Sequence, residues 1–289
     1  MGLFSGIEKL GIMNFDSESL FEEEEKKVHS ENQTDKKTKM DCEKELMYLS
    51  KVICPVCEKE FTTKRIRGSK LKLVKTDLDL RPIYDTADPV KYDTICCPNC
   101  GYGALSRFHG PLSSVYIKLI KEKISSGFVS HSESNGPYTY EESILRYKIC
   151  LANATVKRAK ASEKAYICLK TAWQLRSYRE EVSAQEDDCG LFETVSKEDL
   201  LKEEKEFLKY ALEGFRMART TETPPYCGMD TQVLDYLIAV LALECEDVDT
   251  AGRMISTLLS ERNLSPRISQ RIPELKDMFH ELKNNVEGE

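Results

Sequence analysis

The sequence lacks any hydrophobic run near the roughly 18 residues that a membrane-spanning helix needs. Its N-terminus also lacks the basic region, apolar stretch and small-residue cleavage site of a secretory signal. It has no Gly-rich phosphate loop, no G-x-S-x-G motif and no H-E-x-x-H motif, and none of its four histidines stands at a ligand spacing from another. These absences predict a cytoplasmic chain with no membrane contact, and they favour a non-enzymatic protein over an enzyme.

The charge balance of the chain is mildly acidic, with a formal net charge of −7 over 289 residues. A chain with this balance is not a general binder of nucleic acid, so any contact with a polyanion requires a local basic patch. Hydrophobic residues make up 40% and charged residues 31% of the chain, which is typical of a globular protein rich in helix. The length is sufficient for two domains.

Eleven cysteines are present, and four of them form two Cys-Pro-x-Cys pairs. Four thiolates are a soft donor set that closes a tetrahedral zinc site and leaves no coordination position open. Proline after each first cysteine fixes the local turn, and Gly101 after the last cysteine permits a backbone conformation that other residues resist. We therefore predict a structural Zn²⁺ ion held by Cys54, Cys57, Cys97 and Cys100.

The other cysteines leave two alternatives. Cys96 stands directly before the second pair and could replace Cys97 as a ligand, although this would break the two-residue spacing. Redox catalysis is disfavoured, because disulfide oxidoreductases carry one such pair at a helix N-terminus in a βαβ fold, but zinc release on oxidation stays an alternative. The cysteines outside the pairs are scattered and odd in number, which indicates reduced thiols; they are Cys42, Cys96, Cys150, Cys168, Cys189, Cys227 and Cys245.

Three regions follow one another along the chain. Residues 1–44 combine a short apolar strip, residues 3–12, with a charged stretch that we predict to be a disordered tether. The strip is interpreted either as packing on the chain's own domain or as a docking peptide for a partner. Residues 45–110 are predicted to form a small zinc-ribbon-like β module, in which residues 61–66 and 71–80 pair as a hairpin.

Residues 111–289 are predicted to be helical, with helices over 112–126, 139–158, 161–182, 197–220, 229–245, 248–261 and 265–284. One pattern occurs three times in these helices, as Ala165, Leu169 and Ala172, as Ala211, Phe215 and Ala218, and as Ala251, Ile255 and Leu258. It resembles the second helix of a tetratricopeptide repeat. The spacing between the copies is longer than the period of that repeat, which is about 34 residues. A plain antiparallel bundle is the alternative. The predicted fold class is α+β, a zinc-ribbon-like module followed by an all-α, tetratricopeptide-like domain.

A basic stretch lies inside the predicted β module, with no acidic residue between Glu60 and Asp77. Positive side chains on one hairpin would suit phosphates, and the candidates are Lys64, Arg65, Arg67, Lys70, Lys72 and Lys75. Aromatic residues that stack on bases are nearly absent there, so a solvated hairpin is the simpler interpretation. Five aspartates that follow are expected to form salt bridges rather than a site for a hard cation; they are Asp77, Asp79, Asp85, Asp88 and Asp93.

Several motifs in order give the chain a family resemblance. They are Cys54-Pro55-Val56-Cys57 with Phe61, Asp77-Leu78-Asp79-Leu80-Arg81-Pro82-Ile83-Tyr84, Asp88-Pro89 with Tyr92, Cys97-Pro98-Asn99-Cys100-Gly101-Tyr102 and Ala172-Trp173-Gln174-Leu175-Arg176. They make residues 45–285 similar to a bacterial family known as domain of unknown function 2225. The resemblance implies a cytosolic bacterial protein with a zinc-ribbon-like head and a tetratricopeptide-like body. It implies no reaction, substrate or catalytic residue.

The sequence thus predicts a cytoplasmic zinc-binding protein that serves as a non-enzymatic scaffold for a protein partner. The alternative is a nucleic-acid-associated zinc-ribbon module that uses the basic stretch from Lys64 to Lys75. A gel shift that weakens with salt would separate the two functions. No oligomeric state is predicted.

Overall fold

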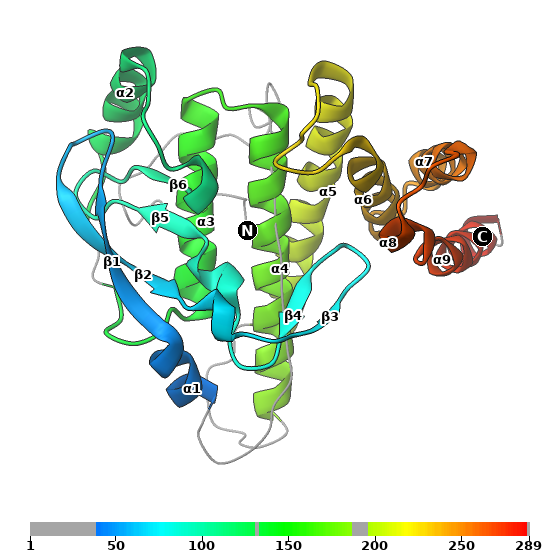
Figure 1. Cartoon of the computed structure of the whole chain (residues 1–289), viewed down its shortest axis with the longest axis horizontal. Helices are drawn as coiled ribbons and strands as arrows, with labels where there is room; N and C mark the ends of the chain where they lie inside the picture. Colours follow the sequence, from blue (N-terminus) through cyan, green and yellow to red (C-terminus); the bar gives the residue numbers. More distant parts are fainter. Residues whose placement is uncertain (1–38, 131–132, 187–195, 288–289) are drawn as a thin grey trace.

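After one short helix, short strands come first along the described chain and the longer helices follow, which confirms the α+β prediction (Figure 1). The structure, a computed structural model, describes residues 39–130, 133–186 and 196–287. The apolar strip at residues 3–12 and most of the predicted tether lie outside these described residues. No helix in the described ranges combines the length and the apolar character needed to cross a bilayer.

The end of the predicted tether is helical, so that prediction is wrong for its last residues. Helix α1 (Lys39–Leu46) leads into the first strand. Glu43 anchors it, because this carboxylate is buried and accepts a hydrogen bond from Tyr92 Oη at 2.7 Å. Lys91 Nζ lies 3.4 Å from the same carboxylate. A buried polar anchor leaves no hydrophobic pattern in the sequence, which is why composition alone suggested disorder.

The strands in the described part of the chain form three separate antiparallel hairpins. Each pairs a strand with the next one along the chain, namely β1 (Met47–Ile53) with β2 (Glu60–Ile66), β3 (Leu73–Thr76) with β4 (Pro82–Tyr84), and β5 (Thr94–Cys96) with β6 (Gly103–Leu105). The β5–β6 hairpin packs against helix α3 (Tyr140–Val156). In Figure 1 the β1–β2 hairpin lies at the left and the β3–β4 hairpin in front of α4 (Ala161–Glu186).

The hairpin predicted between residues 61–66 and 71–80 is wrong. Strand β2 pairs with β1 instead, and residues 68–70 form a 3₁₀ turn rather than a hairpin loop. The first cysteine pair is itself the loop between β1 and β2, because Cys54 N–H donates to Lys59 O at 3.1 Å. The sequence pattern did not identify β1, because its large apolar side chains Leu49 and Ile53 are 65% and 66% exposed.

The remaining helices follow the prediction closely. They are α2 (Ser114–Ile120), which continues into a π turn over residues 121–125, α5 (Lys197–Thr221), α6 (Thr231–Glu244), α7 (Val248–Ser260), α8 (Pro266–Ser269) and α9 (Ile272–Glu287). Side chains cap the N-termini of α2, α3, α5, α6 and α7. Thr139 and Glu142 form a capping box on α3, and Asp230 accepts from Val233 N–H at the start of α6.

The last predicted helix, over residues 265–284, is divided into α8 and α9. Pro273 lies in the first turn of α9. Proline has no N–H to donate and disfavours a helical residue before it, so a helix that begins at α8 cannot continue through this position.

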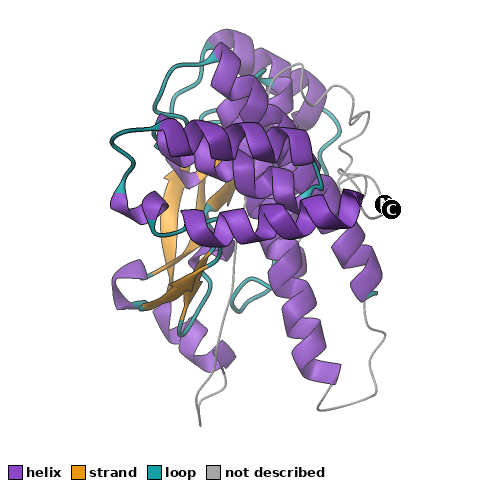
Figure 2. Ribbon diagram, turned by 90° about the vertical axis from the view of Figure 1, so that its right-hand side faces the viewer, coloured by secondary structure: helices purple, strands orange, loops and turns teal. Residues whose placement is uncertain are grey.

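Each helix from α3 to α7 packs against the next along the chain, and α9 packs on α7 and α6. Figure 2 shows this stack with the strands on one side of it. All nine positions of the threefold alanine and leucine pattern are buried. Small residues let the helix axes approach, and large ones fill the remaining space. A tetratricopeptide-like stack and a plain bundle both require this burial, so the repeat assignment stays a prediction.

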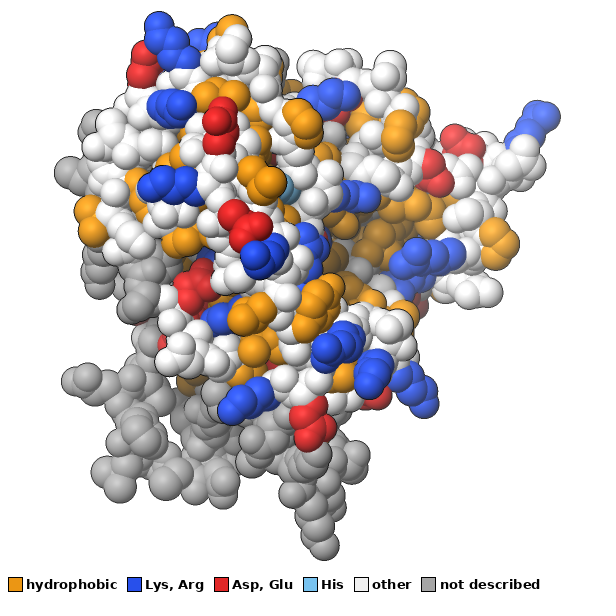
Figure 3. Space-filling model, turned by 60° about the vertical axis from the view of Figure 1, so that its left-hand side comes forward, with side chains coloured by type: hydrophobic (Ala, Val, Ile, Leu, Met, Phe, Trp, Pro, Cys, Tyr) orange, Lys and Arg blue, Asp and Glu red, His pale blue; other side chains and the backbone are white. Residues whose placement is uncertain are grey.

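Polar contacts hold the loop between β3 and β4 against the helices. Asp79 is fully buried, and its Oδ2 accepts from Trp173 Nε1 at 2.7 Å and from Arg176 Nη1 at 2.9 Å. Tyr236 Oη donates to Leu78 O at 3.0 Å. The hydrophobic core is continuous from the cysteine turns to α9. On the surface near the β1–β2 hairpin, hydrophobic and charged side chains are interspersed (Figure 3).

Candidate metal centre

The two cysteine pairs form two turns with the same backbone hydrogen bonds. In each turn the N–H of the first cysteine donates to the carbonyl five residues later. Cys54 N–H donates to Lys59 O, and Cys97 N–H donates to Tyr102 O. The carbonyl of the first cysteine accepts from the N–H four residues later. Cys54 O accepts from Glu58 N–H, and Cys97 O accepts from Gly101 N–H. One turn closes β1–β2 and the other closes β5–β6. The hairpins therefore present two matching turns to each other.

In each turn the residue after the second cysteine has a left-handed backbone conformation. Gly101 has a φ of 72° and Glu58 a φ of 61°. Glycine adopts this region without strain, as the sequence analysis expected at Gly101. A second constraint is present there, because a Cβ atom on Gly101 would lie 2.5 Å from Phe128 Cδ2. The sequence analysis did not identify Phe128 as the side chain that covers this turn.

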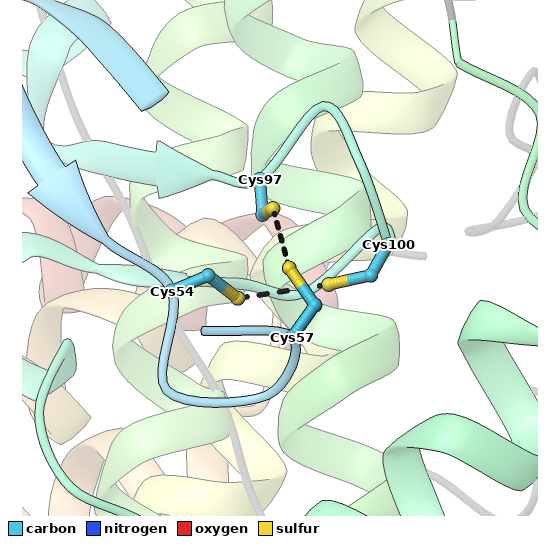
Figure 4. A group of neighbouring side chains, drawn as sticks. All are labelled: Cys54, Cys57, Cys97 and Cys100. Atoms are coloured by element: carbon cyan, nitrogen blue, oxygen red, sulfur yellow. Dashed lines mark hydrogen bonds between the residues drawn. The ribbon is translucent and has the colours of Figure 1, made fainter. Parts of the chain in front are cut away.

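The four sulfur atoms of the two turns lie within 4.8 Å of one another (Figure 4). The Sγ atoms of Cys54 and Cys100 are 3.6 Å apart, and those of Cys57 and Cys97 are also 3.6 Å apart. Tetrahedral zinc with bonds of about 2.3 Å places its sulfurs roughly 3.8 Å apart, whereas a disulfide bond is about 2.05 Å long. The separations between the sulfur atoms are therefore those expected around one shared metal ion, and the cluster could hold one.

The cluster is shielded from solvent and has hydrogen-bond donors beside its sulfurs. Cys54, Cys97 and Cys100 are 0%, 1% and 7% exposed, and Cys57 is partly buried. Val56 N–H lies 3.4 Å from Cys54 Sγ, and Asn99 Nδ2 lies 3.7 Å from Cys97 Sγ. Donors of this kind stabilise metal-bound thiolates and orient them. The middle residues of both pairs thus have a role that spacing alone did not reveal.

The close approach of the thiols shifts the pKa values of Cys97 and Cys100 in opposite directions. The hydrogen bond from Cys100 lowers the pKa of Cys97 to about 2. The pKa of Cys100 is raised in turn, because its hydrogen bond with Cys54 favours the protonated thiol. Four thiolates within this space would repel one another strongly, so full deprotonation requires a positive ion at their centre. The donor set therefore fits a divalent metal.

Cys97, and not Cys96, contributes its sulfur to the cluster. Cys96 Sγ lies against helix α3, 3.7 Å from Arg146 O and 4.0 Å from Cys150 Sγ. The backbone alternation of β5 explains this, since adjacent residues of a strand point to opposite sides. The spacing argument thus selects the same cysteine as the geometry.

The basic candidates do not share one hairpin. Lys64, Arg65 and Arg67 belong to β2 or follow it directly, whereas Lys72 and Lys75 lie at β3. Lys64 is 7% exposed, donates to Ser134 O at 2.7 Å, and is therefore part of the interior.

The remaining basic candidates are more accessible. Lys75 pairs with Asp77 at 3.1 Å, and Arg65 is partly buried. Arg67, Lys70 and Lys72 are exposed, and none of them forms an ion pair with a carboxylate in the described part of the chain. Of the six candidates, these three are the ones that are both exposed and without a carboxylate partner among the described residues.

The salt bridges expected of the aspartates are confirmed for three of them. Asp77 pairs with Arg81 at 2.6 Å, Asp79 with Arg176 at 2.9 Å, and Asp93 with Lys170. The other two accept backbone hydrogen bonds, in Asp85 from Lys72 N–H and in Asp88 from Val90 N–H. These carboxylates are engaged in holding the loops together.

A depression lies beside the first cysteine turn, and the sequence pattern gave no signal for it. It has a volume of about 410 Å³, and Cys54, Pro55 and Glu58 of the turn form one wall. Pro111 and Leu112, which follow β6 in the chain, form the other. His109 also lines it, and burial lowers the pKa of this imidazole. The metal centre therefore borders a partly apolar surface.

Comparison with known protein families matches residues 47–286 to the family described as uncharacterized protein conserved in bacteria (DUF2225). The matched span begins at the first residue of β1 and ends within α9, so it contains both cysteine turns and the helical stack. No curated protein and no solved structure matches the chain. The order of motifs noted in the sequence thus identified the correct family, and the chain belongs to this bacterial family of uncharacterized proteins.

Proposed function

We propose that this protein is a cytoplasmic zinc-binding scaffold, in which one structural Zn²⁺ ion shapes a surface for a protein partner. The observation that carries the proposal is the cluster of four sulfur atoms within 4.8 Å, two from each hairpin. Four thiolates fill the coordination sphere of zinc and leave no position for water or substrate. The ion would therefore hold the fold and would not catalyse a reaction.

Cys54, Cys57, Cys97 and Cys100 are the proposed ligands. Thiolates select Zn²⁺ over the hard ions Mg²⁺ and Ca²⁺, which prefer oxygen. None of the ten described cysteines forms a disulfide bond, which is consistent with the reducing conditions of cytoplasm.

The depression at the first turn is the proposed partner surface. Ile53, which lines it, is 66% exposed and so offers a large apolar side chain to a partner. One wall comes from the turn that bears Cys54, so the metal would fix the shape of this surface. An apolar segment of a partner protein suits it. In this arrangement the zinc ion acts on binding through structure alone.

An affinity capture from native cytosol tests the scaffold proposal, with the intact protein as bait. Ile53→Asp should retain zinc and lose the partner, because it places a charge in the depression. Leu49→Asp is the matched control, since Leu49 is equally exposed on the same strand but does not line the depression. Equal capture by all three proteins, or by none, would contradict the proposed surface.

Nucleic-acid contact is the second candidate, and the exposed charges of Arg67, Lys70 and Lys72 favour it. Substitution of all three by Gln should then abolish a gel shift seen at low salt. If the intact protein gives no shift at low salt, this candidate is removed and the scaffold proposal is unaffected.

A further inference from the structure

A second hollow lies among the helices, away from the metal centre, and we call it the helix groove. Its floor is apolar, with Leu169 and Trp173 from α4 and Leu237 from α6. Leu80 of the β3–β4 loop and Gly228, in the connection before α6, stand on its rim. Figure 3 shows a hollow with hydrophobic side chains at its base and Lys or Arg side chains beside it, toward the right of the view.

One arginine lines the helix groove and two lie near it, and none of the three forms an ion pair with a carboxylate among the described residues. Arg267 lines it, is exposed, and has no ion pair within the described ranges. Arg107 packs its guanidinium 5.5 Å from the ring centre of Tyr166, which also lines the groove, and it donates only to a backbone carbonyl. Arg271 likewise donates to two backbone carbonyls, including Asp77 O at 2.7 Å. Carbonyl contacts leave the positive charges of these side chains unneutralised.

The acidic groups at the helix groove do not cancel these charges. Asp79 is fully buried and already paired with Arg176 at 2.9 Å. Asp230 is exposed on the rim, where it accepts from Val233 N–H at 2.8 Å as the cap of α6. Among the described residues that line the groove, Asp230 is thus the accessible carboxylate and Arg267 the exposed guanidinium, with Arg107 and Arg271 nearby. An anionic ligand with apolar side chains is complementary to this combination.

The size of the helix groove indicates a peptide. Its volume is about 260 Å³, below the roughly 300–1,000 Å³ that is usual for sites that enclose a small molecule. A space of this size accommodates one or two large side chains of a segment that lies across it. Charged residues of the same segment would then reach the arginines on the rim.

We propose that the helix groove binds residues 16–25 of the same chain. This segment reads Asp-Ser-Glu-Ser-Leu-Phe-Glu-Glu-Glu-Glu, with six carboxylates and no Lys or Arg. Leu20 and Phe21 are the apolar pair for the floor, and the carboxylates on both sides face Arg107, Arg267 and Arg271. The bound segment covers the groove and excludes other acidic, apolar peptides. This inference does not depend on the metal.

The chain is long enough for this contact. Fourteen residue steps separate Glu25 from Lys39, where α1 begins. They span at most roughly 50 Å when extended, and a compact domain of this size, with a radius of gyration of about 19 Å, has a diameter of about 49 Å. A fully extended tether is therefore about as long as the molecule is wide.

The experiment uses the full zinc-loaded chain and the fluorescence of Trp173, which lines the groove and is the sole tryptophan. The double variant Leu20→Ser, Phe21→Ser empties the groove. A synthetic peptide of residues 14–27 should then bind this variant about tenfold more tightly than the intact chain, whose groove is already covered. Adding Arg267→Glu to the double variant should weaken peptide binding by about tenfold, and salt should weaken it further.

Arg262→Glu on the same double variant is the matched control, because Arg262 is exposed but does not line the groove. It should leave peptide binding unchanged. Zinc content and far-UV circular dichroism confirm that each variant is folded. Failure of the peptide to bind the double variant would overturn the proposal, as would equal effects of Arg267→Glu and Arg262→Glu.

Discussion

The cysteine turns and the helical stack are held together in different ways. The hairpins that carry the turns are short, and β1 exposes most of its large side chains. Two-stranded hairpins are at best marginally stable alone in water. Helices α3 to α7, in contrast, bury apolar residues along whole faces, such as Phe207, Ala211 and Phe215 of α5. The core is sufficient to hold the stack, whereas we propose that the turns also depend on a bound ion.

This difference between the two regions predicts which of them a given substitution should destabilise first. Removal of a sulfur should loosen the hairpins first, and removal of core volume should destabilise the stack first. The β5–β6 hairpin belongs to both regions, because it carries Cys97 and packs on α3. Local loosening and global unfolding can be separated by hydrogen exchange, which reports on each segment independently.

Cys97→Ser should have the largest effect. It removes one of four ligands, and structural zinc sites contribute apparent binding free energies of about 10–16 kcal/mol in small peptides. We expect loss of the metal and fast hydrogen exchange in β1, β2, β5 and β6, while α5 to α7 stay protected. Cys42→Ser, in α1 and outside the cluster, should keep both metal and protection. Full metal content in Cys97→Ser would refute the ligand assignment.

Phe207→Ala should have the next largest effect, and in the opposite region. Phe207 is fully buried in α5, so truncation leaves a cavity and should lower the free energy of unfolding by about 3–5 kcal/mol. The metal content should stay unchanged, because no ligand lies on this helix. Chemical denaturation and metal analysis of the same sample measure both quantities. A simultaneous loss of metal would mean that the two regions do not differ as described.

Asp88 lies where the segment between β4 and β5 meets the helical stack. Its Oδ2 accepts a hydrogen bond from Gln174 Nε2 of α4 at 2.7 Å. Burial raises the pKa of Asp88 from 3.8 to about 6. The folded state therefore binds more protons than the unfolded state between these values, so the contribution of Asp88 is present below pH 4 and is lost as the pH rises to about 6. The loss is at most about 3 kcal/mol.

Asp88→Asn should remove this pH dependence. The difference in unfolding free energy between the two proteins, measured from pH 4 to pH 7, isolates the contribution of Asp88 from that of other groups. A constant difference across this range would show that the pKa of Asp88 does not rise on folding.

Gly101→Ala should have the smallest effect. The φ of 72° costs a non-glycine residue about 1–2 kcal/mol, and the new Cβ would also displace the ring of Phe128. We expect a weaker affinity for zinc, measured by competition with a chelator, and an unchanged helical stack. Gly68→Ala is the control, because it has no atom within 4 Å of the new Cβ. Equal zinc affinity in both variants would show that the second turn does not limit metal binding.

The helices and the cysteine cluster could be predicted because their signals are local. Caps such as Thr139 and the repeated small residues mark helices directly, and a two-residue spacing marks a metal turn. The pairing of β2 with β1 could not be predicted in this way, since β1 exposes side chains that a strand pattern expects to be buried. The buried Glu43 and the helix groove depend on contacts between distant segments, which leave no periodic pattern in the sequence.

X-ray absorption at the zinc edge, together with metal analysis of the purified protein, tests the central claim most directly. The account predicts one zinc ion per chain with four sulfur neighbours at about 2.3 Å and no nitrogen or oxygen neighbours. Protein without stoichiometric metal, or with disulfides between the two turns, would contradict it.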